Sequence, residues 1–236
     1  MDFVIGGYYL IQGVARADWM DSALLPSPFW SVSRCICRSW PDSWIFTWTT
    51  DSRSQQQRQQ FREVLGLDEA GFQLLQEKFD ELLNRDAFGF PNVFYSLHLA
   101  RDFYSEFLSH LPNVRLLSAA LPEVYVDTFI EEYTPGQGIG ESGVRRKLRE
   151  HIPIESHSRF RGFEVLGFNY ANFCSFVCNS LETGYHTRLG IAFNQNGLID
   201  QYEEAARAAE YTNQNEVGAE PYWWLPWLIS EYPAKE

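Results

Sequence analysis

Apolar side chains recur at two different spacings along this chain, and both spacings are typical of regular structure. Between residues 68 and 83 they recur every three or four positions, which predicts an amphipathic helix with Asp68 at its N-cap. Between residues 43 and 50 every second side chain is aromatic over the central part, which predicts a strand with one aromatic face. A chain with both spacings in separate segments must combine helices with a sheet.

Further segments of both kinds are spread along the sequence. Helices are predicted over residues 55–65, 96–111, 173–181 and 198–211, and strands over 114–117 and 163–168, whereas 124–129 fits either. Residues 3–11 form a tight hairpin at Gly6-Gly7 or one strand with a bulge there. The apolar residues 221–229 are expected to pack back onto the domain. The sequence thus predicts an α+β fold with a mixed or antiparallel sheet and several amphipathic helices.

The length of 236 residues favours one α+β domain over residues 1–236. Residues 134–143 contain four glycines and a proline, so they form a long loop or a boundary between subregions. The basic run 145–149 follows directly, which is superficially a phosphate-binding arrangement. The spacing matches neither a Walker loop nor a dinucleotide fingerprint, so we predict a mobile loop before a charged surface helix. The basic side chains could also pair with carboxylates of this chain.

The formal net charge is −12, and the C-terminal part is the most acidic. Such a charge repels nucleic acid and anionic membranes and accelerates encounter with a basic protein, although solubility alone also explains it. No apolar run is long enough to span a bilayer. Four cysteines and the absence of a glycosylation sequon fit a reducing cytoplasm. We therefore expect a cytoplasmic protein without nucleic-acid or membrane partners, of unknown oligomeric state.

Motifs that would identify an enzyme or a metal site are weak. The cysteines, at Cys35-x-Cys37 and Cys174-x-x-x-Cys178, are interpreted as buried thiols, with a zinc site or a redox pair as alternatives. The five histidines form no metal-binding motif, and no metal or cofactor is expected. The alternative enzyme would be a small-molecule hydrolase that uses Asp127, Glu131 or a histidine, with residues 134–143 as a lid.

The eight tryptophans are the most unusual feature of the composition, and three of them crowd into residues 223–227. Core packing explains most of them, but an alternating strand cannot hide three indoles this close together. A displayed indole beside carboxylates would suit a basic, apolar partner. The candidate partner-binding residues are Trp223, Trp224, Trp227, Glu216, Glu220 and Glu231.

Four stretches of the C-terminal third carry a family resemblance. They are Arg-Gly-Phe-Glu-Val-Leu-Gly-Phe at 161–168, Cys-Asn-Ser-Leu-Glu at 178–182, Asn-Gly-Leu-Ile at 196–199 and Trp-Leu-Pro-Trp-Leu at 224–228. Together they resemble bacterial immunity proteins of polymorphic-toxin and contact-dependent-inhibition systems. The resemblance implies a small acidic cytoplasmic inhibitor that binds one toxin domain and has no catalytic residues. We therefore expect a non-enzymatic immunity or inhibitor protein that neutralises a basic toxin domain.

Overall fold

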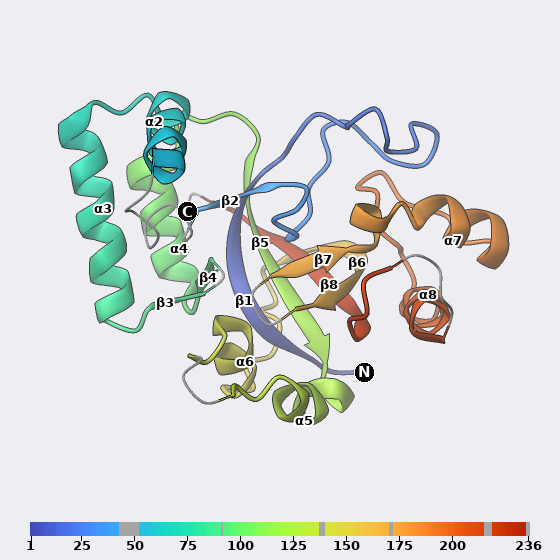
Figure 1. The fold of residues 1–236 in the computed structure, drawn as a ribbon. Coiled ribbons are helices and arrows are strands. Elements are labelled where there is room, and N and C mark those ends of the chain that lie inside the picture. Colours follow the sequence, from blue (N-terminus) through green and yellow to red (C-terminus); the bar gives the residue numbers. More distant parts are fainter. Residues whose placement is uncertain (43–51, 91, 137–139, 170–171, 215–218, 235–236) are drawn as a thin grey trace.

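The computed structural model describes residues 1–234 except 43–51, 91, 137–139, 170–171 and 215–218, and excludes the side chains of 52–55 and 57. Within these residues eight strands form one antiparallel sheet in the order β3-β4-β1-β5-β8-β6-β7, with β2 also paired to β1 (Figure 1). This arrangement confirms the predicted α+β fold. The strands are β1 (Phe3–Gln12), β2 (Arg38–Trp40), β3 (Phe88–Gly89), β4 (Val93–Phe94), β5 (Val114–Pro122), β6 (Arg159–Phe168), β7 (Phe173–Ser175) and β8 (Trp224–Tyr232). The strand predicted over 43–50 lies outside the described residues.

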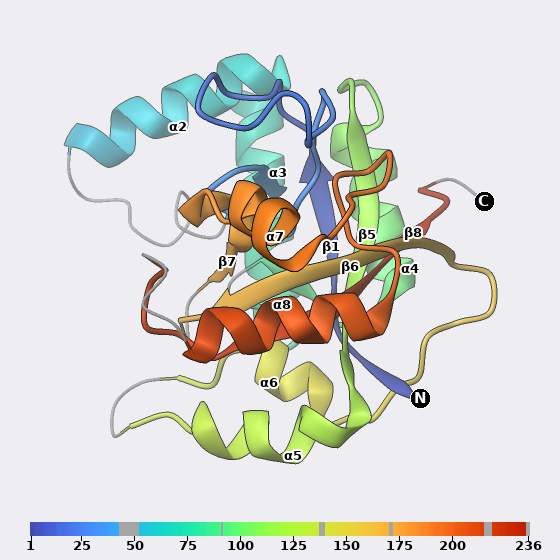
Figure 2. The same cartoon turned by 90° about the vertical axis from the view of Figure 1, so that its right-hand side faces the viewer.

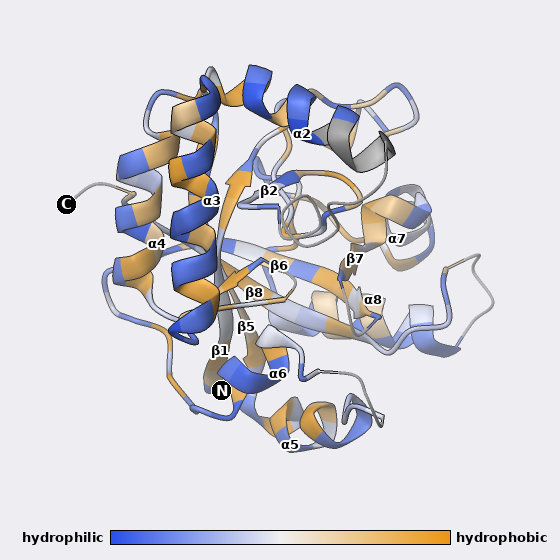
Figure 3. Cartoon of the chain, turned by 60° about the vertical axis from the view of Figure 1, so that its left-hand side comes forward, coloured by the Kyte–Doolittle hydropathy of each residue, from blue (hydrophilic) through white to orange (hydrophobic). Residues whose placement is uncertain are grey.

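Helices cover the sheet from several sides. In Figure 1, α2, α3 and α4 lie on one side of β1, α5 and α6 lie at the lower end, and α7 and α8 lie on the other side. Figure 3 shows hydrophobic and hydrophilic residues alternating along α3, as expected for an amphipathic helix. The helices are α2 (Ser52–Leu65), α3 (Glu69–Asn84), α4 (Leu97–Phe103), α5 (Glu123–Glu132), α6 (Gly143–Leu148), α7 (Glu182–Leu189) and α8 (Tyr202–Gln214), with a π-helix η1 (Tyr104–Leu108) and a 3-10 helix η2 (Phe176–Asn179).

The N-terminal segment is a single strand with a bulge, which is the second of the two predicted alternatives. The pairing of β1 with β5 shifts register between Ile5 and Gly7. Gly7 has a φ of +152°, and a Cβ there would lie 2.5 Å from Cγ1 of Val93. Glycine is therefore required at this bulge both by the backbone conformation and by the space available.

Gly7→Ala is expected to lower the free energy of unfolding by about 1–3 kcal/mol, because it adds backbone strain and a steric clash. Gly184 is the matched control, since a Cβ added there meets nothing within 4 Å and the residue lies in α7. Gly184→Ala should stabilise the protein by about 0.5–1 kcal/mol through helix propensity. Urea unfolding of both variants checks the two opposite signs, and equal effects would contradict this account.

Two segments differ from the predicted structure. Residues 173–181 are not one helix, because β7 pairs with the end of β6 before the short helix η2 begins. The ambiguous segment 124–129 lies in helix α5, which buries Val126 and Phe129. In both places hydrogen bonds to, or packing against, distant parts of the sheet decide between local alternatives.

The prediction of a charged surface helix after the glycine-rich loop is wrong. Helix α6 buries Arg145 and Lys147 along with its apolar residues. Arg145 Nε donates to the carbonyl of Ile130 at 2.7 Å, and its guanidinium pairs with Glu141 at 2.5 Å. The basic side chains are therefore held by partners within this chain, as the alternative prediction had it. Because their hydrogen bonds are satisfied, the helix can lie against β1 instead of in solvent.

The C-terminal strand β8 lies inside the sheet, between β5 and β6. This position confirms that the apolar tail packs back onto the domain. Strands from before and after the glycine-rich loop thus belong to one sheet. Helix α8 contacts β8 and β6, and Figure 2 shows α8 running above α6 and α5. Because elements cover both of its faces, β8 is buried almost throughout its length.

Candidate functional site

Two of the three clustered indoles belong to the core, which corrects the prediction that they form an exposed anchor. Trp224 is 1% exposed and Trp227 is 0% exposed. The Trp227 ring packs against Phe129 and Phe173, with ring centroids 5.5 and 4.9 Å away. The prediction assumed that one face of the strand meets solvent. A central strand covered on both faces can bury consecutive large side chains.

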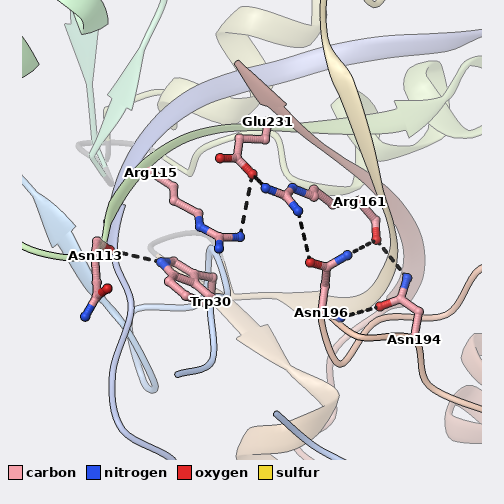
Figure 4. Close-up of polar contacts among 7 residues, drawn as sticks. All are labelled: Trp30, Asn113, Arg115, Arg161, Asn194, Asn196 and Glu231. Atoms are coloured by element: carbon pink, nitrogen blue, oxygen red, sulfur yellow. Dashed lines mark hydrogen bonds and ion pairs between the residues drawn. The ribbon is translucent and has the colours of Figure 1, made fainter. Parts of the chain in front are cut away.

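Glu231 forms ion pairs within the chain (Figure 4). Its carboxylate lies 3.6 Å from Arg115 and forms an ion pair with Arg161. The Arg115 guanidinium stacks over the Trp30 ring at 3.5 Å, and the Trp30 indole N–H donates to the carbonyl of Asn113. The negative charge of Glu231 is therefore matched by two cations of adjacent strands, and its assignment as a partner-binding residue stays a prediction.

The rest of this cluster ties a surface loop to the sheet. Asn194 and Asn196 both donate to the carbonyl of Arg161, at 2.8 and 3.0 Å, and the Arg161 guanidinium donates to Asn196 at 3.2 Å (Figure 4). Burial lowers the pKa of Arg161 to about 10, and the nearby charges of Arg115 and Arg159 add to this effect. The cluster is a structural network in which the charged groups are paired with one another.

Trp223 is the one indole of the three that remains half-buried at the surface. Its ring meets Tyr125 edge to face at a centroid distance of 6.1 Å. Glu220 is exposed three residues earlier, and its carbonyl accepts the indole N–H of Trp224 at 3.1 Å. Glu216 lies outside the described residues. Of the predicted set, Trp223 and Glu220 thus lie near each other at the surface.

A groove of about 500 Å³ lies between α8, α5 and the start of β8. Its walls include Tyr125, Tyr202, Glu203, Glu210 and Trp223. Burial raises the pKa of Tyr202 to about 12, with a further contribution from its hydrogen bond to Tyr125. The two tyrosines and the indole form an aromatic floor that is partly open to solvent. Nothing in the sequence signals that α5 lies beside α8.

Carboxylates of α8 border this groove. Glu203 and Glu210 are exposed on α8 at helical spacing, while the alanines of the opposite face pack against the sheet. Arg207 lies between them and donates to the carbonyl of Leu189 at 3.0 Å. Helix α5 lines the groove with Tyr125, and its exposed carboxylates Glu123, Asp127, Glu131 and Glu132 lie outside the lining. The groove therefore combines an aromatic floor with an acidic border, and we call it the acidic aromatic groove.

The four cysteines do not form the tetrahedral zinc site that was one alternative. Cys37 is buried, where its sulfur accepts from the Ser31 N–H at 3.3 Å and donates to the carbonyl of Phe29 at 3.5 Å. The thiol thus points to backbone groups of its own segment. In the part of the chain that the structure describes, no group of three or more His, Cys, Asp or Glu residues is arranged to hold a metal ion.

A second cleft, of about 480 Å³, is lined by several polar side chains. It is the candidate active site for the alternative hydrolase function. Tyr8 donates to Glu155 at 2.9 Å, and His157 lies 2.9 Å from the same carboxylate. Lys147 donates to Glu150 at 2.6 Å. These side chains satisfy one another's hydrogen-bonding groups. The Ile5 N–H on β1 also donates to the carbonyl of Ile152, in the segment between α6 and β6. The arrangement is typical of a network that fastens residues 149–158 to β1. Asp127 and Glu131 lie on α5 instead.

None of the helices in the described ranges is both long and apolar enough to cross a membrane. Comparison of the chain with protein-family models, with curated proteins and with solved structures finds no match.

Proposed function

We propose that this protein is a non-enzymatic binding protein that holds a basic protein partner in the acidic aromatic groove. The observation that carries the proposal is the groove itself, where the half-buried Trp223 and two tyrosines lie beside two exposed carboxylates of α8. Aromatic side chains at a partly open surface are typical binding hot spots. Glu203 and Glu210 outnumber Arg207, the cation of the groove lining, so the border favours a partner of positive charge.

The resemblance noted in the C-terminal third narrows the proposed class of partner. An immunity or inhibitor protein neutralises a toxin domain by occupying the surface that the toxin uses. A net charge of −12 would accelerate the encounter with a basic toxin domain, and the aromatic floor would then slow dissociation. We therefore propose a basic toxin domain as the partner, bound without any chemical step.

Neutralising the groove is expected to slow association with the partner about tenfold at low salt. The test variant is Glu203→Gln/Glu210→Gln, and the matched control is Glu63→Gln/Glu77→Gln on α2 and α3, across the sheet from the groove (Figure 1). Both double variants remove two exposed charges. Only the first should lose the partner, because its charges border the aromatic floor. Trp223→Ala should instead accelerate dissociation by about tenfold.

The measurement is affinity capture by the three tagged proteins from their native cells, with quantitative mass spectrometry at low and high salt. A basic protein that is retained by the wild type and the control but lost by the groove variant supports the proposal. Its rate constants with each variant are then measured on the purified pair. Toxicity of that protein when it is expressed alone, relieved by co-expression, supports the inhibitor role. Identical capture by all three proteins contradicts the groove as the binding surface.

A further inference from the structure

Three of the four cysteines come together from segments that are distant in sequence. Cys35 lies in the turn 33–37, which is closed by hydrogen bonds from Ile36 and Cys37 to the carbonyl of Ser33. Cys174 lies in β7 and Cys178 lies in η2. The Cys35 thiol lies close enough to both of them for the three groups to shift one another's pKa. The sulfur of Cys178 also lies 3.2 Å from the Ser33 hydroxyl oxygen. All four cysteines are free thiols.

Access to these thiols is graded from the surface inward. Cys35 is exposed, Cys178 is half-buried and Cys174 is buried. Cys35 also lines an open cavity of about 610 Å³, together with Arg34 and Asp42. A small molecule can therefore reach Cys35 first, and the other two thiols lie behind it. This is the order that a reactive thiol with a resolving partner requires.

The surroundings favour the thiolate form at Cys35. Hydrogen bonds from Cys174 and then Cys178 lower its pKa, and the Ser33 hydroxyl and the Arg34 guanidinium add to the effect. The same contacts and burial raise the pKa of Cys174, to which the charge of Glu220 contributes, and that of Cys178. Arg34 is paired with Asp42 at 3.2 Å, which fixes it beside the turn. One thiolate is therefore stabilised beside two thiols that stay protonated.

We propose that Cys35 is a peroxide-reactive cysteine that forms a disulfide with the Cys174 and Cys178 pair. The Cys35 thiolate attacks one oxygen of hydrogen peroxide, the O–O bond breaks, and Cys35 sulfenic acid and hydroxide result. A thiol of the pair then loses its proton and attacks the sulfenic sulfur. The S–S bond forms, the S–O bond breaks and water leaves. Two thiols are oxidised by two electrons while one peroxide is reduced to two waters.

This inference is independent of the proposed partner, because the thiols lie in the turn 33–37 and in β7 and η2 rather than in the acidic aromatic groove. Of the two cysteines in the pattern Cys35-x-Cys37, the proposed oxidation involves Cys35. The second stays buried, and burial raises the pKa of Cys37 to about 12. The two cysteines of this short pattern thus have opposite reactivity.

The test treats the intact reduced protein with hydrogen peroxide, blocks remaining thiols with iodoacetamide and maps tryptic peptides. Trypsin releases residues 35–38 and 162–188, and each of these peptides carries two cysteines. We expect one cross-linked species that joins the two peptides. It should be lost in Cys35→Ser and retained in Cys37→Ser. Cys174→Ser and Cys178→Ser then assign the resolving thiol. A bond within either peptide, or oxidation of Cys35 without a cross-link, overturns the proposal.

A second measurement does not depend on cross-linking. Iodoacetamide at pH 6 should alkylate Cys35 roughly tenfold faster than the other three cysteines in the folded protein, because only a thiolate reacts. In guanidinium chloride the four rates should become equal. Equal rates in the folded protein would overturn the assignment of Cys35 as the reactive thiol.

Discussion

Trp227→Ala is expected to lower the free energy of unfolding by about 3–5 kcal/mol, the range for a large aromatic side chain removed from a core. The indole is fully buried at the centre of the sheet, against Phe129 of α5 and Phe173 of β7. Its removal leaves a cavity between a helix and the sheet that neighbouring side chains cannot fill. Guanidinium chloride unfolding followed by far-ultraviolet circular dichroism measures the change.

Trp19 is the matched control, because it is 52% exposed. Trp19→Ala should change the free energy of unfolding by no more than about 0.5 kcal/mol. The comparison decides between the core role of Trp227 and the partner-binding role that the sequence suggested. If Trp227→Ala unfolded at the same denaturant concentration as the wild type, the indole would not be a core residue, and a binding role would have to be restored.

The elements with local signals were predictable from the sequence. Helix α3 begins after Asp68, whose carboxylate accepts from the Gly71 N–H at 2.8 Å, and it buries the apolar stripe that the spacing predicted. Helix α2 ends before Gly66, which has a φ of +63°. In each case a cap or a glycine and one continuous apolar face lie within a single stretch of sequence. Such signals depend on residues that are close in sequence, so they can be recognised before the fold is known.

The position of each strand within the sheet could not be predicted, and this limited the prediction of the site. Alternation along β8 would display Trp224 or Trp227 only if one side of the strand faced solvent, and β8 is buried almost throughout. Glu231 was counted as a free charge because Arg115 and Arg161 reach it only through strand pairing. Trp223, a candidate from the sequence, lines the groove, whereas Tyr125 was missed because nothing local places α5 beside α8.

The same limitation hid a buried acid in the middle of β6. Glu164 is 0% exposed, although its sequence neighbours gave no sign that both faces of the strand would be covered. One carboxyl oxygen accepts from the Ser31 hydroxyl at 2.5 Å. Burial raises the pKa of Glu164 to about 7, and hydrogen bonds from Ser175, Ser31 and the Val32 backbone oppose only part of that effect. An acid in this environment makes the stability of the fold depend on pH.

Glu164→Gln is expected to stabilise the protein by about 3 kcal/mol above pH 8 and to have little effect near pH 4. The folded pKa of about 7 lies above the ordinary value of 4.5, so the folded state binds the proton more tightly than the unfolded state does. The free energy of unfolding of the wild type therefore falls as the pH rises from about 4.5 to about 7. At about 1.4 kcal/mol per pH unit the loss reaches about 3 kcal/mol. Glutamine keeps the shape and remains neutral throughout.

Urea unfolding of the wild type and the variant at intervals from pH 4 to pH 8.5 measures this difference. Glu77→Gln is the matched control, since Glu77 is exposed on α3 and its replacement should give a difference that stays within about 0.5 kcal/mol at every pH. A stabilisation by Glu164→Gln that grows between pH 4.5 and 7 and then levels off identifies one buried carboxyl as its source. A variant less stable than the wild type at pH 8 would show instead that the Glu164 carboxylate is charged and held by its hydrogen bonds.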